Sequence, residues 1–235
     1  MVHFLSLRGS PRSTAYLCLD LIRLGSAYFQ EQVFREVVVA TQPSSFIRCR
    51  FEDCQGTENG ALVSSGNNEL VVEQTDPLRC WSKTKCAGLK KENGKLQMNC
   101  CLFKECHGNR DDNIFGTAMG TSNCDAKILD ATFLMCWKAA SPYADAVYGL
   151  YKGAADINGI NSSNCISRNG GLSGNLFEVG AGADLRYIQG VQGEEHNGFE
   201  IFHAGQTVHC MNLINNSFSH FLFYSKYAKL LVSYG

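Results

Sequence analysis

The sequence predicts an all-β solenoid, a fold in which short strands are wound into stacked coils. The first observation is a repeat anchored on Cys54, Cys80, Cys106, Cys136 and Cys165, whose numbers differ by 80−54 = 26, 106−80 = 26, 136−106 = 30 and 165−136 = 29. The second observation is that apolar residues recur at fixed distances before each cysteine. A repeat of roughly 20 to 50 residues is typical of units that bury their apolar face against their neighbours.

The apolar positions of each repeat come in pairs two residues apart. Three residues before the cysteine stand Phe51, Phe103 and Phe133. Residues at the same distance before each cysteine form a column. The column five residues before it holds Cys49, Thr75, Cys101, Ala131 and Ile160, and the column eight residues before it holds Phe46, Val72, Met98, Ile128 and Ile157. The column ten residues before it holds Leu70, Leu96, Ala126 and Ala155. Offsets that differ by two indicate strand alternation rather than a helical period. We therefore expect about three short strands in each repeat, with Gly, Asn and Asp at the corners.

This pattern resembles the right-handed parallel β-helix proteins, the architecture of pectate-lyase-like enzymes, autotransporter passengers and polymorphic-membrane-protein repeats. The resemblance covers about residues 45 to 228 and lies in the pattern rather than in a family fingerprint. It implies a right-handed parallel β-helix of about seven coils over residues 45–235, each coil rising ~4.8 Å. Residues 1–44 then form an N-terminal cap segment.

The cap segment has a composition of its own. Residues 13–39 contain few glycines, and their apolar residues include a helical spacing through Leu17, Leu21, Leu24 and Phe29. Ser13 or Thr14 suits the N-cap of such a helix. Because an open solenoid end exposes core and strand edge, a short capping helix is the predicted use of this segment. The alternative is an amphipathic helix that binds a partner, and Val37–Val39 is a candidate first strand.

Composition and charge limit the function classes. The chain has 235 residues, 45% of them hydrophobic and 18% charged, and a net charge of −1. These values predict a folded domain with no nucleic-acid partner. No stretch approaches the ~20 uninterrupted apolar residues of a membrane span. The first eight residues hold too short an apolar run for a signal peptide. We therefore expect an intracellular, cytoplasmic or cytoskeletal protein, or a cell-surface or secreted one if the natural start is missing.

The twelve cysteines predict a buried ladder of reduced thiols. Five of them form the cysteine ladder, Cys54, Cys80, Cys106, Cys136 and Cys165, and Cys49 and Cys101 share the column five residues before it. Free cysteine packs as a small hydrophobe, so these residues and Phe51, Phe103 and Phe133 form a structural ladder. Disulfides between neighbouring coils and metal binding are the alternatives. No CxxC is present, which makes the zinc pattern weak, and no cofactor is expected.

Two acidic clusters are weak candidates for a site. Asp111 and Asp112 match the paired acids that the resemblance to polysaccharide hydrolases implies, but the companion motifs are missing, so a solvent-facing turn is the better interpretation. Glu194, Glu195 and His196 could bind a divalent ion or act as general acid and base. They are predicted to lie in a glycine-flanked turn, where charged residues are common. The sequence therefore predicts no catalytic, cofactor-binding or metal residues.

Two functions remain. The first is a non-enzymatic structural or interaction protein, a rigid rod docked among the other proteins of a larger assembly. The second is a carbohydrate-binding or polysaccharide-processing protein at the cell surface, for which Trp81, Trp137 and Tyr143 are the available stacking residues. The lysine-rich segment 81–91 is either a binding patch or, as we prefer, a solvated loop.

Overall fold

The computed structural model describes the greater part of the chain from Ala27 onward. The described residues are 27–57, 59–83, 86–108, 118–141, 148–151, 153–169, 175–179, 183–191, 194–201, 207–214, 217–225 and 231–233. Side chains are described within these ranges up to residue 137, and again over 153–165.

All described secondary structure is β-strand, and the strands form one hydrogen-bonded sheet. The strands are β1 (Ala27–Gln30), β2 (Val33–Phe34), β3 (Val38–Ala40), β4 (Ser44–Ile47), β5 (Arg50–Glu52), β6 (Gln55–Gly56), β7 (Leu62–Ser65), β8 (Glu69–Glu73), β9 (Asp76–Leu78), β10 (Trp81–Ser82), β11 (Leu89–Lys104), β12 (His107–Gly108), β13 (Met119–Leu134), β14 (Trp137–Ser141), β15 (Tyr148–Tyr151), β16 (Ala155–Ser163), β17 (Ile166–Asn169), β18 (Asn175–Val179), β19 (Ala183–Val191), β20 (Glu194–Ile201), β21 (Thr207–Ile214), β22 (Ser217–Ser225) and β23 (Leu231–Ser233).

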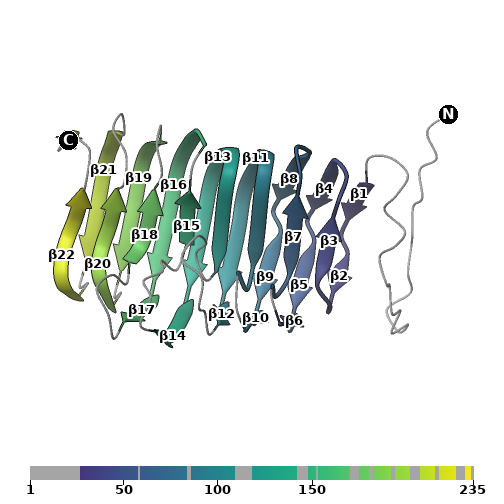
Figure 1. Cartoon of the computed structure of the whole chain (residues 1–235), viewed down its shortest axis with the longest axis horizontal. Coiled ribbons are helices and arrows are strands. Elements are labelled where there is room, and N and C mark those ends of the chain that lie inside the picture. Colours follow the sequence, from purple (N-terminus) through teal and green to yellow (C-terminus); the bar gives the residue numbers. More distant parts are fainter. Residues whose placement is uncertain are drawn as a thin grey trace.

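Each strand pairs in parallel with the equivalent strand of the next coil, so the coils stack along one axis (Figure 1). The chain is thus a parallel β-solenoid, as the repeat predicted. The predicted columns are its register: Phe46 pairs with Val72, Val72 with Met98, Met98 with Ile128 and Ile128 with Ile157. The predicted count of seven coils is not confirmed.

The corners of the coils are single residues in the left-handed conformation. One set lies six residues before the ladder cysteine (Arg48, Gln74, Cys100 and Asp130), and another lies one residue before it (Asp53, Arg79, Glu105, Met135 and Asn164), all with φ between 46° and 55°. Such φ values cost free energy for residues other than glycine. The prediction of Gly, Asn and Asp at the corners is too narrow, because Arg, Gln, Glu, Cys and Met also occupy them.

The interior is formed by stacked columns of like side chains. Phenylalanine rings stack between coils with a centroid distance of 4.9 Å in three pairs, Phe29 with Phe46, Phe34 with Phe51, and Phe103 with Phe133. Pro77 continues the Phe51 column in register. Each coil therefore buries its apolar side chains mainly against its neighbours, as expected for a solenoid.

The predicted N-terminal helix is not confirmed. Residues 13–26 lie outside the described residues, and from Ala27 the chain forms β1, β2 and β3. These strands pair with β4, β5 and β7, so Phe29 belongs to a strand rather than to a helix. Phe29 and Phe34 precede their register partners Phe46 and Phe51 by a shorter interval (46−29 = 17 and 51−34 = 17) than separates the later repeats.

No helix among the described residues is long and apolar enough to cross a membrane.

Candidate functional site

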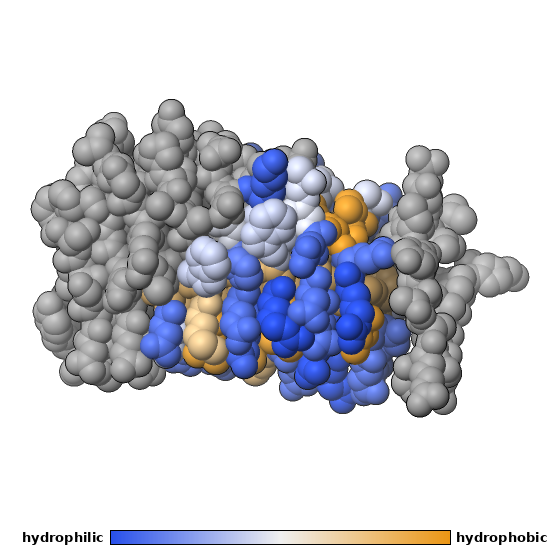
Figure 2. All heavy atoms as spheres, turned by 90° about the horizontal axis from the view of Figure 1, so that it is seen from below, coloured by the Kyte–Doolittle hydropathy of each residue, from blue (hydrophilic) through white to orange (hydrophobic). Residues whose placement is uncertain are grey.

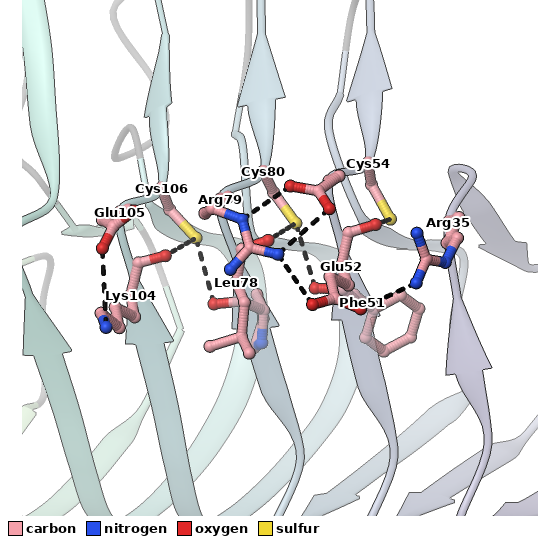
Figure 3. A network of polar contacts seen from close by, with 12 residues as sticks. Arg35, Phe51, Glu52, Cys54, Leu78, Arg79, Cys80, Lys104, Glu105 and Cys106 are labelled. Carbon is pink, nitrogen blue, oxygen red and sulfur yellow. Dashed lines mark hydrogen bonds and ion pairs between the residues drawn. The ribbon is translucent and has the colours of Figure 1, made fainter.

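The cysteine ladder lies in the dry interior. All five of its side chains are fully buried, with relative exposures of 0%. Each thiol lies 3.4 or 3.5 Å from a backbone carbonyl oxygen of the preceding coil, for example Cys80 from Phe51 and Cys136 from Phe103. Each also lies near the carbonyl two residues before it. Figure 3 shows three of these thiols pointing the same way in successive coils.

A second polar column alternates sulfur with oxygen. Cys49 and Cys101 are separated by Thr75, whose hydroxyl lies 3.1 Å from the Phe46 carbonyl and 2.8 Å from that of Glu73. The same hydroxyl accepts the backbone N–H of Cys49 at 3.1 Å. Burial raises the pKa of Cys101 to about 12. Cys49, Cys101 and the ladder cysteines are free thiols in the interior, whereas the free thiol of Cys100 is exposed.

A cluster of charged side chains covers the outer corner beside the ladder (Figure 3). Arg79 contacts Asp53 with its Nε at 2.7 Å and Glu52 with its Nη2 at 2.7 Å. Arg35 of the preceding coil contacts the other oxygen of Glu52 at 3.2 Å. The hydrogen bond from Arg79 lowers the pKa of Asp53. The cluster links three coils, but its solvent exposure limits its contribution to stability.

A row of exposed charges follows the register of β8, β11 and β13. Glu69 pairs with Lys95, and Lys95 pairs with Asp125, so charges of opposite sign alternate from coil to coil. We call these three residues the charge row. The face drawn in Figure 2 is likewise mainly hydrophilic over the described coils. A regular spacing of alternating charge is a surface that a partner can match.

Aromatic residues of three coils form a column on the outer surface. Trp81 pairs with His107, and His107 pairs with Trp137. The His107 and Trp137 rings stack with a centroid distance of 4.6 Å and an interplanar angle of 7°. Trp137 is 40% exposed. The register thus brings together two of the three predicted stacking residues, while Tyr143 lies outside the described residues.

The prediction of a solvated lysine loop is wrong for two of its residues. Lys90 and Lys91 lie in β11 and are 4% and 0% exposed. The Lys91 ammonium donates to neutral oxygens of the preceding coil, at 3.2 Å to Ser64 Oγ, 3.0 Å to the Gly66 carbonyl and 2.5 Å to Asn68 Oδ1. Burial lowers its pKa. These neutral acceptors, which no sequence pattern identified, allow the side chain to lie inside.

The acidic candidates gain no support from their placement. Asp111 and Asp112 lie outside the described residues. Glu194, Glu195 and His196 begin β20, so the predicted turn is wrong. Glu194 and Glu195 pair with β17 and β22, and His196 lies at a shift of the register with β22. Within the part of the chain that the structure describes, no group of three or more His, Cys, Asp or Glu side chains is arranged to hold a metal ion.

Comparison of the chain with protein-family models, curated proteins and solved structures finds no match.

Proposed function

We propose that this chain is a non-enzymatic structural or interaction protein, a rigid parallel β-solenoid docked among other proteins in a larger intracellular assembly, such as one of the cytoskeleton. The observation that carries the proposal is the charge row, in which Glu69, Lys95 and Asp125 are held at the coil spacing by backbone register. Register fixes the backbone spacing of the row, so a partner with a complementary row would bind without any change of the backbone here, and preorganisation of that kind favours association.

The free thiols support the intracellular part of the proposal. The ladder cysteines are free although neighbouring coils place them side by side. Persistent thiols are typical of reducing compartments, whereas secreted proteins commonly pair them.

Charge reversal tests the docking surface. Lys95→Glu places a negative charge between Glu69 and Asp125, and we expect the variant to leave the large-assembly fraction of native cells while its melting temperature changes little. Lys104→Glu is the matched control, because Lys104 lies in the same strand beyond the corner at Cys100. Equal retention of both variants, or recovery of the wild-type chain as a free monomer, would reject the charge row as the docking surface.

A second candidate function is carbohydrate binding, which the column of Trp81, His107 and Trp137 favours. Aromatic rings in register could contact successive sugars of an extended chain. The stacking of His107 on Trp137 covers one face of each of these rings, which weakens this candidate. Tryptophan fluorescence distinguishes this function from protein docking. If added oligosaccharide protects the tryptophans of the wild type from quenching by acrylamide, but does not protect those of Trp137→Ala, the carbohydrate function is favoured.

A further inference from the structure

The charge row lies on one sheet face of the solenoid. This face, which we call the row face, is formed by β1, β4, β8 and the parallel-paired segments of β11, β13 and β16. Alternate residues of each segment point outward, and Glu69, Lys95 and Asp125 are all exposed. Their exposure leaves the row face open to a partner.

The spacing and the signs of the row select the kind of partner. Successive charges are one strand pairing apart, about 4.8 Å. A partner matches this spacing residue for residue if it is itself a stack of paired strands. The row reads negative, positive, negative, so a copy of it shifted by one coil is its complement. A second copy of this chain therefore has both the spacing and the charges that the row face requires.

We propose that the row face binds a second copy of the chain in a two-fold symmetric dimer, which rests on the proposed function of the charge row as a docking surface. The two-fold axis runs along the strands, midway between Glu69 and Lys95. The two solenoids then run in opposite directions, and each register column faces the same column of the second copy. Glu69 faces the second copy's Lys95, and Lys95 faces the second copy's Glu69.

A neighbouring outward column fits the same axis. Ile47, Glu73, Asn99 and Leu129 follow one another in register. In the dimer Glu73 faces the second copy's Asn99, whose amide can donate to the carboxylate. Ile47 faces the second copy's Leu129, which brings two apolar side chains together. An axis along the stack would instead place Glu73 opposite the second copy's Glu69, and like charges across an interface oppose association.

Other positions of the axis are less favourable. Moving it by half a coil places either Lys95 or Glu69 opposite the same residue of the second copy. Moving it by a full coil pairs Lys95 with Asp125, but it also places the apolar Val71 opposite the carboxylate of Asp156, which belongs to the same column. The axis between Glu69 and Lys95 is therefore the one that the charges and the apolar residues both favour.

The size of the row face predicts a reversible dimer. Six paired segments at ~4.8 Å, with three outward residues along each at ~6.7 Å, give a face of roughly 30 by 20 Å. That area is smaller than the ~800 Å² that each partner contributes to a standard interface. Exposed ion pairs add little and weaken with salt. The dimer is therefore expected to dissociate on dilution and at high salt.

Charge exchange tests the axis, with sedimentation velocity of the purified full chain at low salt as the measurement. The wild type should dimerise. Lys95→Glu and Glu69→Lys should each raise the dimer Kd at least about tenfold, because each places like charges opposite each other. An equimolar mixture of the two variants should form a heterodimer, since both facing pairs are then opposite in sign. The double variant E69K/K95E should dimerise alone for the same reason.

The matched control is Asp125→Lys. Asp125 belongs to the same row, but at this axis it faces the uncharged Pro43 of the second copy, so the variant should remain dimeric. A monomeric wild type, a dimeric Lys95→Glu, or single variants that do not pair when mixed would overturn the dimer. Circular dichroism verifies that each variant is folded, and E69K/K95E tests the pairing if a single variant is not.

The dimer and the docking function fail in different ways. If the purified wild type is monomeric but Lys95→Glu still leaves the large-assembly fraction of native cells, the dimer is overturned and the charge row docks on a different protein. If Lys95→Glu stays in that fraction, the docking function itself is rejected. The mixing experiment and the cell fractionation therefore report on the two proposals separately.

Discussion

At the scale of the residue, stability comes from side chains that repeat their contacts from coil to coil. Phe103 is fully buried and stacks on Phe133 at 4.9 Å. Its ring also lies close to Gly88, where an added Cβ would come within 2.6 Å of it. A side chain so enclosed leaves a cavity when it is truncated.

We expect Phe103→Ala to lower the free energy of unfolding by about 3–5 kcal/mol through lost burial and the cavity that remains. Lys95→Ala, on the exposed side of the same strand, should cost less than about 0.5 kcal/mol. Chemical denaturation measures both. Similar losses in the two variants would mean that Phe103 does not face the interior.

The Thr75 hydroxyl has a role that only the structure reveals. It accepts the backbone N–H of Cys49, which is itself buried. Thr75→Val retains the shape but leaves that N–H without its partner, at a cost of about 1–3 kcal/mol. Thr75→Ser retains the oxygen and should recover much of this loss. If the Val and Ser variants unfold at the same denaturant concentration, the hydrogen bond contributes nothing.

Buried thiols also predict how stability depends on pH. An unfolded cysteine titrates near ~8.5, whereas burial raises the pKa of Cys101 to about 12. The folded state holds this proton more tightly, so the contribution is complete below ~8.5 and is lost as pH rises toward 12. One such thiol gives a slope of about 1.4 kcal/mol per pH unit. The Cys101→Ala variant should show a shallower alkaline decline in urea titrations than the wild type, and parallel declines would contradict the assignment.

At the scale of the element, corners and strands have opposite requirements for glycine. Gln74 and Gln97 are both exposed, but Gln74 lies at a corner with φ of 46° and Gln97 lies within β11. We expect Gln74→Gly to be neutral or stabilising by up to about 1 kcal/mol, because glycine adopts left-handed φ without strain. Gln97→Gly should destabilise by roughly 0.5–1 kcal/mol. Thermal melts of the pair measure this, and the same sign for both would contradict the corner assignment.

The sequence predicted the elements wherever the spacing between equivalent residues stayed regular. Cysteine and phenylalanine recur at similar intervals from Cys54 to Cys165, and those columns match the strand register. Strands β1 and β2 were not predicted because they precede their partners by a shorter interval and carry no cysteine anchor. The candidate strand Val37–Val39 overlaps β3. The helical spacing that includes Phe29 was therefore the stronger pattern in that segment.

Site prediction was limited by a different physical factor. The sequence identified the cysteine ladder and two tryptophans. Trp81, His107 and Trp137 each follow a ladder cysteine by one residue, a signal of their shared column that the predicted set of stacking residues did not use. It also placed Lys91 in solvent because charge usually excludes lysine from a core. Three oxygens from residues 64–68 overturn that rule, and they come from another coil. Hydrogen bonds between coils, such as those of Lys91, depend on the strand register, which the composition of a segment does not reveal.

At the scale of the whole molecule, residues far apart in sequence become neighbours along one axis. A single register column runs through successive paired strands and contains Ser45, Val71, Gln97, Lys127, Asp156 and Asp184. The proposed docking surface needs this register. If the register failed, the row of alternating charges would not exist.

The most direct measurement is the distance between spin labels along that column. Labels carried on non-natural side chains at Ser45 and, in turn, at Lys127, Asp156 and Asp184 leave the native cysteines in place. Because these positions lie three, four and five strand pairings from Ser45, pulsed electron resonance should give distances that increase by about 4.8 Å per pairing. Distances that do not increase along the column would contradict the solenoid and the docking surface proposed on it.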